Sequence, residues 1–588
     1  MNKQKKLTLT FIALLVLAIV IAGIALLVKR YMPSNREMAL TDYFKVSEGE
    51  MQVILQDQIY DTKALYENGQ IYVDYGMVHD YLNSRFYWDS KENQLLYTTS
   101  TAVISAAADS QDYYTNKSKA SMDYPIVKVK GDTAYVALDY VKERTALDYK
   151  KYDKPDRVVI TYRYNEKADY AKAKKKARIR YRASIKSDIL VKLKEDDQVR
   201  VLEQGDSTKS GDGNESSFDK VMSVDGVVGY VRRKDLGKIY QSEYTTDFKE
   251  EQYTHILKDG KVNLVWHQVT TSAANDGVLN LLNATKGVNV VAPTWFTVSG
   301  NHGEITSLAS DAYVSRARSL GVDVWGVCND FSNDSKIGKV LERTTTRQKL
   351  EKNLIAEAIK YSLDGINIDF EHVRKANGDD FIQFIRELGI MCRNNGVVLS
   401  IDNYPPTSYS MYYNRKEQAA VADYVITMAY DEYYAGSPEA GPVSSYNYVK
   451  EGITETLKEV PAEKVISGIP FFTRLWKETP KTEEELKSDK GTDAEQYSAT
   501  VESDAYGMDN AQAVVKQAGV DTTWDKKAGQ NYATWEADGS KYEIWLEDSK
   551  SIEAKLKLMK KYKLAGTAEW SLGQESSDIW NLIQKYVN

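Results

Sequence analysis

Cysteine and histidine are both scarce in this chain. Two cysteines, Cys328 and Cys392, leave room for at most one disulfide, which would be a minor feature among 588 residues. Only five histidines are present. His267 and His372 lack a third ligand at useful spacing, so the sequence predicts no metal site and no cofactor.

An excess of basic residues is also missing. The 77 Lys and Arg residues are outnumbered by 84 Asp and Glu, and the net charge is −7. Without an overall basic field the chain has little to attract nucleic acid, and we predict no nucleic-acid partner. The hydrophobic content of 42% is ample for packed cores, and the length predicts about three to four domains. Protein partners are not predicted by any motif.

One hydrophobic run stands apart from the rest of the chain. Residues 7–28 contain no charge, and Lys3, Lys5 and Lys6 precede them. This length can span a bilayer, and the flanking charge favours an amino terminus inside the cell. We predict a single-pass anchor in the cell membrane, with the carboxy-terminal bulk on the extracellular face. The alternative is a cleaved signal peptide and secretion, although the run is longer than usual and no small-x-small cleavage site follows it.

Residues 46–165 contain a weak internal repeat of short strands. Gly69–Val78 aligns with Gly131–Val141, about 62 residues apart, and each copy precedes a short helical stretch and another strand. We predict a small α+β domain that two copies complete together. It resembles the small stalk-type domain found ahead of copper amine oxidases, and this resemblance implies no copper chemistry here.

Residues 172–240 predict a second small domain, which is all-β. Apolar strands at 189–193, 197–202 and 226–231 are separated by polar turns. The strand order and the Gly-Tyr-Val ending resemble a bacterial SH3 domain. That family often binds cell-wall peptides, and the alternative is a compact spacer.

From residue 253 to 588, short apolar strands alternate with amphipathic helices. This pattern predicts βα units around a parallel sheet, and eight strands are the number that closes a (β/α)8 TIM barrel. The fold class is therefore α/β. The candidate strands are Val262–His267, Val288–Thr294, Val322–Cys328, Gly365–Phe370, Val397–Ile401, Tyr424–Met428, Val465–Ile469 and Gly566–Trp570.

A line of polar side chains ends the fourth candidate strand. Asn367, Asp369 and Glu371 are two residues apart, so they project to one side of the strand, whereas the apolar residues between them project to the other. Two acids held close together at a buried strand end favour sharing a proton, which keeps one of them protonated near neutral pH. The alternative is a salt-bridged strand end.

The stretch Asp364-Gly-Ile-Asn-Ile-Asp-Phe-Glu371 resembles the DxxDxDxE signature of family 18 glycoside hydrolases, which include chitinases and peptidoglycan N-acetylglucosaminidases. Met428-Ala-Tyr-Asp431 resembles the MxYD element of that family, and Trp570 resembles the tryptophan that floors its sugar site. One departure is Asn367, where the signature usually has Asp.

The resemblance implies a mechanism and a set of catalytic residues. In this family the substrate's own N-acetyl group supplies the nucleophile. Glu371 would be the general acid and base, Asp369 would orient the acetamido group, and Tyr430 would donate a hydrogen bond to its oxygen. Asp364 and Gly365 would be structural parts of the signature.

Other residues fall near or just past predicted strand ends, where barrel enzymes place their sites. Each could line a sugar subsite, and the alternative for each is a place in the core. The substrate-binding candidates are Trp570, Asp431, Met428, Asn367, Tyr404, Trp295, Asn329, Arg474 and Glu569, with Trp325, Phe471 and Trp476 as further lining candidates.

Together these features predict a retaining glycosidase that cleaves β-linked N-acetylglucosamine polymers, with peptidoglycan as the first choice of glycan partner. Chitin or an N-glycan core is the alternative substrate within the enzyme class. A non-catalytic cell-wall glycan-binding protein is the alternative of another class, and the presence of Glu371 argues against it.

Overall fold

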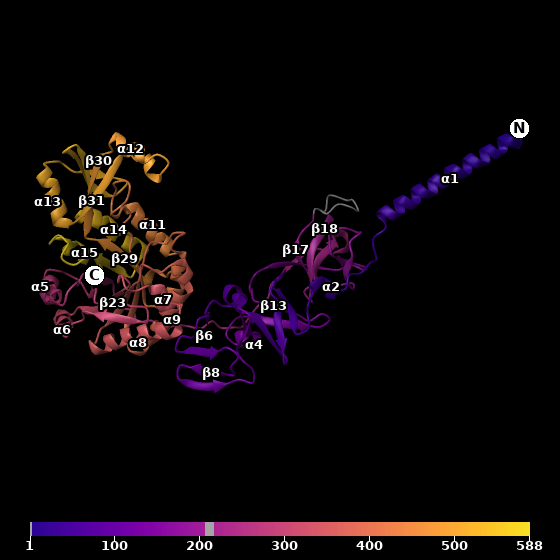
Figure 1. Ribbon diagram of the computed structural model, residues 1–588, viewed down its shortest axis with the longest axis horizontal. Coiled ribbons are helices and arrows are strands. Elements are labelled where there is room, and N and C mark those ends of the chain that lie inside the picture. The colour runs from indigo at the N-terminus through magenta and orange to yellow at the C-terminus, as the bar shows by residue number, and fades with distance from the viewer. Residues whose placement is uncertain (1–2, 206–216, 588) are drawn as a thin grey trace. The chain divides into compact units, whose positions relative to one another are not determined.

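The computed structural model describes residues 3–205 and 217–587, which form two compact units (Figure 1). The first unit comprises the residues up to Trp88 together with Ser105–Glu250. The second comprises Asp89–Ile104 and the residues from Glu251 onward. The candidate site lies entirely in the second unit.

Eight parallel strands of the second unit close into a barrel, which confirms the predicted fold. Each strand pairs in parallel with the next, and β22 pairs with both β21 and β25, so that the ring has no open edge. The barrel strands are β21 (Val262–His267), β22 (Val290–Pro293), β25 (Asp323–Asn329), β26 (Gly365–Asp369), β27 (Val398–Asn403), β28 (Tyr424–Thr427), β29 (Val465–Pro470) and β35 (Gly566–Trp570).

The strands are apolar on both sides because both sides are buried, as expected of parallel sheets. One cluster, which includes Leu264, Trp325 and Ile426, fills the interior of the barrel. A second and larger cluster packs the outside of the strands against the surrounding helices. The helices are α5 (Val278–Asn283), α6 (Asp311–Ser319), α7 (Ile337–Leu341), α8 (Thr344–Lys360), α9 (Gly378–Asn394), α10 (Arg415–Val421), α11 (Tyr446–Thr456), α14 (Ser549–Tyr562) and α15 (Ile579–Val587).

Helix α9 shows why these segments are helical. Its apolar residues Phe381, Phe384, Ile385, Leu388 and Cys392 fall at positions i, i+3, i+4, i+7 and i+11, and all are buried. This spacing places them along one side of a helix, where they pack against the barrel strands.

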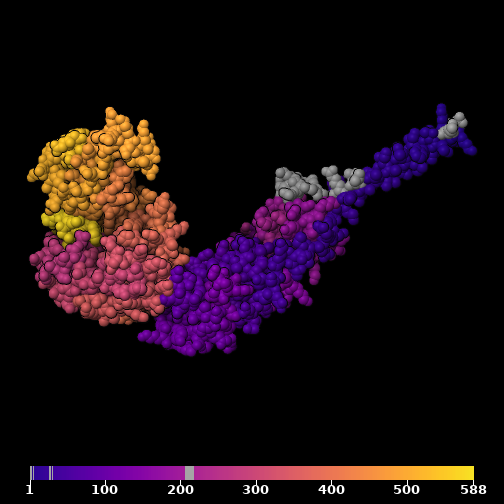
Figure 2. Space-filling model, in the orientation of Figure 1, coloured from indigo at the N-terminus to yellow at the C-terminus, as the bar shows by residue number. Residues whose placement is uncertain are grey.

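A subdomain is inserted between the seventh and eighth barrel strands. It follows directly from the carboxyl end of β29 and forms a lobe of the second unit, orange in Figures 1 and 2. The sequence alone gave no motif for residues 477–535, but the structure forms a five-stranded antiparallel sheet there. Its elements are β30 (Phe472–Pro480), α12 (Glu483–Ser488), β31 (Ala499–Gly507), α13 (Met508–Ala518), β32 (Thr523–Asp525), β33 (Gln530–Ala537) and β34 (Ser540–Leu546). A separate hairpin of β23 (Phe296–Ser299) and β24 (Glu304–Ser307) follows barrel strand β22.

Residues Asp89–Ile104 also belong to the second unit. The Asp89 carboxylate accepts hydrogen bonds from the backbone N–H (2.6 Å) and the hydroxyl (2.7 Å) of Thr344, the first residue of α8. Asp89 therefore acts as a helix cap, because the first N–H groups of a helix have no partner within it. Thr98 accepts a hydrogen bond from Gln383 of α9 at 2.8 Å.

The internal repeat of the first unit pairs through its equivalent strands. Strand β4 (Gln70–Asp74) of the first copy lies antiparallel to β11 (Thr133–Ala137) of the second, with Val73 opposite Val136. Each strand is followed by a short helix, α3 (Tyr75–Met77) or α4 (Leu138–Lys142). The neighbouring elements along the chain are β1 (Glu50–Leu55), β2 (Gln58–Ile59), β3 (Ala64–Glu67), β5 (Phe86–Asp89), β6 (Gln94–Thr98), β7 (Val103–Ala107), β8 (Asp112–Thr115), β9 (Ser118–Ser121), β10 (Val127–Lys130), β12 (Asp148–Tyr152) and β13 (Arg157–Thr161), of which β6 belongs to the second unit.

A seven-stranded antiparallel sheet covers the region for which an all-β domain was predicted. The predicted unit 172–240 includes residues 206–216, which lie outside the described residues, and its assignment as an SH3 domain stays a prediction. The strands are β14 (Ala168–Lys172), β15 (Arg178–Arg180), β16 (Ile189–Lys192), β17 (Gln198–Glu203), β18 (Phe218–Ser223), β19 (Val228–Arg232) and β20 (Tyr240–Ser242).

The first described element is the long helix α1 (Lys3–Tyr31). Within it, Lys5–Ala25 is long and apolar enough to cross a membrane by length and composition. A signal sequence near the amino terminus would meet the same criterion, so the membrane anchor stays a prediction. The short helix α2 (Leu40–Phe44) follows.

Candidate active site

Strand β26 carries the centre of the site. Ile366, Ile368 and Phe370 belong to the cluster outside the barrel, so the residues between them face the opposite side, toward the barrel interior. Asn367 and Asp369 therefore enter the interior, and Glu371 follows two residues beyond Asp369. The alternation expected from the sequence holds over this whole segment.

Asn367 is fully buried and makes hydrogen bonds on both sides of its amide. Trp266 Nε1–H donates to Asn367 Oδ1 at 2.9 Å. The amide nitrogen of Asn367 donates to Asp402 Oδ1 at 2.9 Å and to Ser400 Oγ at 3.0 Å. An ionised aspartate in this place could not donate to Asp402. Asn367 thus supports the carboxylates around it, and its burial keeps it away from direct contact with a polymer.

Asp369 is 6% exposed, and its Oδ1 atom has no hydrogen-bond partner among the described residues. Burial raises the pKa of this carboxyl well above its usual range, and the nearby Asp402 and Glu371 carboxylates raise it further. A buried oxygen without a partner is costly. Asp369 is therefore prepared to share a proton or to bond a polar group that enters the barrel mouth.

Glu371 is held from two sides. The hydroxyl of Tyr404 donates a hydrogen bond to Glu371 Oε2. The Asp330 carboxylate accepts from the backbone N–H groups of Glu371 (3.0 Å) and His372 (2.9 Å). Burial raises the pKa of Glu371, the Tyr404 hydrogen bond lowers it, and the Asp330 charge raises it. The net result is a carboxyl that stays protonated at higher pH than an ordinary glutamate, as a general acid requires.

The chain after β28 contributes Tyr430 and Asp431. Burial raises the pKa of the Tyr430 hydroxyl well above its usual range, and the charges of Asp402, Asp369 and Glu371 act in the same direction, so this phenol stays protonated. Asp431 adopts a left-handed backbone conformation (φ 54°) and is exposed. Met428 is 7% exposed and packs in the barrel interior, so it lines the site from below.

Three further candidates lie where they can border a cleft. Trp570 is partly buried against the interior cluster, with its ring centroid 5.9 Å from that of Trp266. Arg474 belongs to the inserted subdomain. Its Nη1 donates to Ser503 at 3.3 Å. Burial raises the pKa of Asp431, and the charge of Arg474 opposes this rise. Asn329 ends β25 and is 7% exposed.

Besides Asn367, the structure buries two more of the predicted substrate-binding residues. Trp295 is 1% exposed, and its indole N–H donates to Asn275 at 2.8 Å within the cluster outside the barrel. Glu569 is fully buried and lies on the opposite side of β35 from Trp570. Neither side chain can touch a polymer. The same holds for three of the further lining candidates, which are packed in cores: Trp325, Phe471 and Trp476.

Asp364 and Gly365 hold the beginning of β26. The Asp364 carboxylate accepts from Arg318 Nη2 and from the backbone N–H of Val324, both at 2.9 Å. A Cβ atom on Gly365 would lie 2.5 Å from the ring of the buried Trp325. These contacts are consistent with a structural part for both residues, which stays a prediction.

Sequence reasoning missed Asp330 and Asp402. Asp330 follows β25 in Cys328-Asn-Asp330, and Asp402 lies near the carboxyl end of β27 in Leu399-Ser-Ile-Asp402. The polar residue after a strand was the available signal, because the carboxyl ends of all barrel strands meet at one face. Burial raises the pKa of Asp402 well above its usual range, and the Asn367 hydrogen bond lowers it.

This arrangement can perform acid catalysis at a saccharide bond. It offers a carboxyl with a raised pKa at the barrel mouth, a second carboxyl with an oxygen free to accept a hydrogen bond, a protonated phenol, and a half-buried tryptophan. The histidines named at the sequence level take other partners, since His267 lies 2.9 Å from Tyr313 and His372 lies 3.1 Å from Asp330.

Comparison with known proteins finds two families whose models match parts of the chain. Residues 307–575 match the model of Glycosyl hydrolases family 18, and residues 53–161 match the Copper amine oxidase N-terminal domain. The second match agrees with the resemblance of the repeat-containing domain.

Two curated relatives come from Bacillus subtilis. An uncharacterized glycosylase, YvbX, is 25% identical over 315 residues, which are 51% of this chain and 84% of the relative. A cortical fragment-lytic enzyme is 27% identical over 266 residues, and the match covers 44% of this chain and just over half, 57%, of that enzyme.

Among solved structures, the C-terminal domain of a putative chitinase from Desulfitobacterium hafniense is similar with a TM-score of 0.49 and 21% identity. The similarity covers 56% of this chain and 100% of that domain. Residues 307–575 are therefore similar to a family 18 glycosyl hydrolase domain, and the curated relatives over this region are named as a glycosylase and a lytic enzyme.

Proposed function

We propose that this protein hydrolyses the β-linked N-acetylglucosamine bonds of peptidoglycan with retention of configuration. The observation that carries the proposal is the pair of inward-facing acids, Asp369 and Glu371, both with a raised pKa and with one oxygen of Asp369 left without a partner. Such a pair matches the substrate-assisted mechanism of the family, in which no second carboxylate attacks the sugar.

In the first step Glu371 protonates the glycosidic oxygen. The acetamido oxygen of the same sugar then attacks its anomeric carbon, the bond to the leaving sugar breaks, and an oxazolinium ion forms. Glu371, now a carboxylate, removes a proton from a water molecule that opens this ring. Two inversions at one carbon return the original configuration.

Asp369 and Tyr430 act on the acetamido group. The unpartnered Asp369 oxygen accepts the acetamido N–H and stabilises the positive charge that develops on the ring. Tyr430 donates its hydroxyl to the acetamido oxygen, and its raised pKa keeps that proton in place. Trp570, Asp431, Tyr404, Asn329 and Arg474 would border the sugar and its neighbours.

The choice of peptidoglycan has two supports besides the acids. One relative is named a cortical fragment-lytic enzyme, which points to a wall glycan rather than chitin. The helix α1 is apolar enough to anchor the chain in the cell membrane, and its flanking lysines favour the barrel on the extracellular side. A membrane-anchored glycosidase facing outward would meet the wall as its polymer.

The test compares the full chain in detergent with its Glu371→Gln variant on purified peptidoglycan. Mass spectrometry identifies the new reducing ends. Products with reducing N-acetylglucosamine, made only by the wild type, are the expected result. If both proteins bind the glycan and neither cleaves it, the chain is a glycan-binding protein. If the wild type cleaves chitin oligomers alone, the substrate part of the proposal is wrong.

A further inference from the structure

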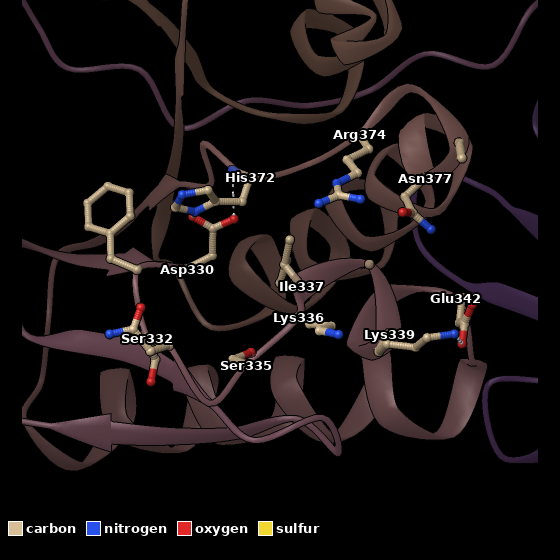
Figure 3. A pocket seen from close by; sticks show the side chains of 14 residues that line it. Asp330, Ser332, Ser335, Lys336, Ile337, Lys339, Glu342, His372, Arg374 and Asn377 are labelled. Atoms are coloured by element: carbon tan, nitrogen blue, oxygen red, sulfur yellow. Dashed lines mark hydrogen bonds and ion pairs between the residues drawn. The ribbon is translucent and has the colours of Figure 1, made fainter. Parts of the chain in front are cut away.

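A pocket of about 580 Å³ lies beside the catalytic strand, and the mechanism leaves it unused. It is formed by the chain after β25 and the chain after β26 (Figure 3). The lining residues that matter here are Asp330, Ser335, Lys336, Lys339, His372 and Arg374. We call it the loop pocket.

The acids of the loop pocket are already satisfied, but two of its cations are not. Lys339 pairs with Glu342 at 2.9 Å. Asp330 accepts the two backbone N–H groups described above and lies 3.1 Å from His372 Nδ1. Neither the Lys336 ammonium nor the Arg374 guanidinium has a partner among the described residues.

A buried hydroxyl adds an unused hydrogen-bond donor to these two cations. The Ser335 Oγ atom is buried and has no hydrogen-bond partner within the residues that the structure describes. A buried polar atom without a partner is costly, and a ligand that supplies one removes the cost. Two free cations and one free hydroxyl in the same pocket match an anion that accepts several hydrogen bonds.

The loop pocket adjoins the loop that holds the catalytic acid. Asp330 lines it and at the same time holds the backbone N–H of Glu371, the catalytic acid. His372, the next residue, lines it as well. Phe331 forms an apolar wall there, with 46% of its surface exposed and its ring edge-on to His372 at 5.7 Å. Because the pocket begins at the residue after Glu371, it is placed on the side from which a substituent of a neighbouring sugar can approach.

We propose that the loop pocket binds a carboxylate carried by the sugar next to the bond that Glu371 protonates. The inference rests on the proposed function, since peptidoglycan has such a carboxylate on its muramyl residues and chitin has none. Two sources share this chemistry: the lactyl group itself, where no peptide is attached, and the acidic residues of the peptide stem. Lys336 and Arg374 would pair with the carboxylate, and Ser335 would donate its hydroxyl.

The test uses the full chain in detergent and three forms of the same wall glycan. The first form carries its peptides, the second has been stripped by an amidase to leave free lactyl carboxylates, and in the third those carboxylates are converted to neutral amides. The variant is Lys336→Gln with Arg374→Gln, changed together because a single exposed ion pair contributes little. Lys375→Gln is the matched control, an exposed lysine beside Arg374 that does not line the pocket.

For the wild type and for Lys375→Gln we expect kcat/KM on a charged form to exceed that on the amide form by roughly tenfold, mainly through KM. In the double variant this ratio falls to about one. A preference for the stripped form identifies the lactyl carboxylate, whereas a preference for the peptide-bearing form alone identifies the stem.

Other outcomes overturn the inference in distinguishable ways. Equal cleavage of all three forms by the wild type, or an unchanged ratio in the double variant, would refute the loop pocket and leave the proposed function standing. Cleavage of none of the forms would refute both. The thermal unfolding midpoint of each variant is measured alongside, and both changed side chains are exposed, so folding should be unaffected.

Discussion

The hydrogen bond from Tyr404 to Glu371 allows a specific prediction about how activity depends on pH. The Tyr404 hydroxyl donates to the charged form of the acid and so lowers the pKa of Glu371. In Tyr404→Phe that stabilisation is lost, the protonated acid is favoured, and the pKa of Glu371 rises. Because the first step needs the protonated acid, activity should persist to higher pH in the variant than in the wild type.

The size of the shift follows from the exposure of the tyrosine. A hydrogen bond to a charged group contributes about 1.5–3 kcal/mol when it is well buried. Tyr404 is 40% exposed, so we reduce this to about 1 kcal/mol. One pKa unit corresponds to 1.36 kcal/mol, and the alkaline limb should therefore move upward by about 0.7 unit.

The assay is kcat/KM against pH, which reports the free enzyme. The Asp369–Glu371 pair titrates together, so the limb gives an apparent value for the pair. Tyr409→Phe is the control, since that side chain is 87% exposed and lies five residues further along the same loop. A limb that stays in place or moves downward in Tyr404→Phe, with normal folding, would refute the assignment of Glu371 as the acid.

Four other outcomes test the same structure. Glu371→Gln should lower kcat by about 10²–10⁴ without changing the circular dichroism spectrum, since it removes a general acid, and a smaller loss would mean another group supplies the proton. Gly365→Ala should cost about 1–3 kcal/mol in urea unfolding, because the new methyl meets the Trp325 ring, and an unchanged midpoint would contradict that contact. Burial raises the pKa of Glu569 to about 8, above the unfolded value of about 4.3, so the wild type loses stability as pH rises between these values. Glu569→Gln should remove that loss and give a higher melting temperature than the wild type at pH 8 but not at pH 4. If the melting temperatures of the variant and the wild type change equally with pH, the raised pKa of Glu569 is contradicted. Activity should survive dialysis against EDTA, because each step is assigned to a side chain or to the substrate, and a loss that added zinc or calcium reverses would disprove this.

The barrel was predictable because its strands are buried on both sides. A strand without a polar side appears in the sequence as a short apolar run. Each predicted run coincides with an observed strand, and the ends differ by no more than two residues. The inserted subdomain could not be found in this way. Strand β31, for example, alternates intermediate and exposed positions and lacks a continuous apolar side.

The predicted site was less complete than the fold. Glu371, Asp369 and Tyr430 meet at the barrel mouth, as the motif implied. Glu569 was wrong for a simple reason: it precedes Trp570 on one strand, and neighbouring residues cannot both face the interior. The alternation of side chains along the strand would have excluded Glu569 from the substrate-binding candidates once Trp570 was included.

Two other features could not be read from the sequence. The burial of Trp295 depends on Asn275, which lies 20 residues away along the chain. The part played by Asp330 depends on the pairing of β25 with β26, which places Asn329 opposite Asp369. Both are contacts between segments whose own patterns say nothing about each other.

The cap that Asp89 provides for α8 shows that the boundary of a family match differs from the boundary of a folding unit. By family resemblance Asp89 belongs to residues 53–161, yet its carboxylate completes a helix that begins 255 residues later. A gene fragment starting at residue 253 would encode every catalytic group and still lack that cap, at a cost of about 1 kcal/mol. Replacing the amino-terminal domain with an unrelated one would remove the same cap and cost the same stability. The barrel is therefore expected to be most stable together with the segment that carries Asp89.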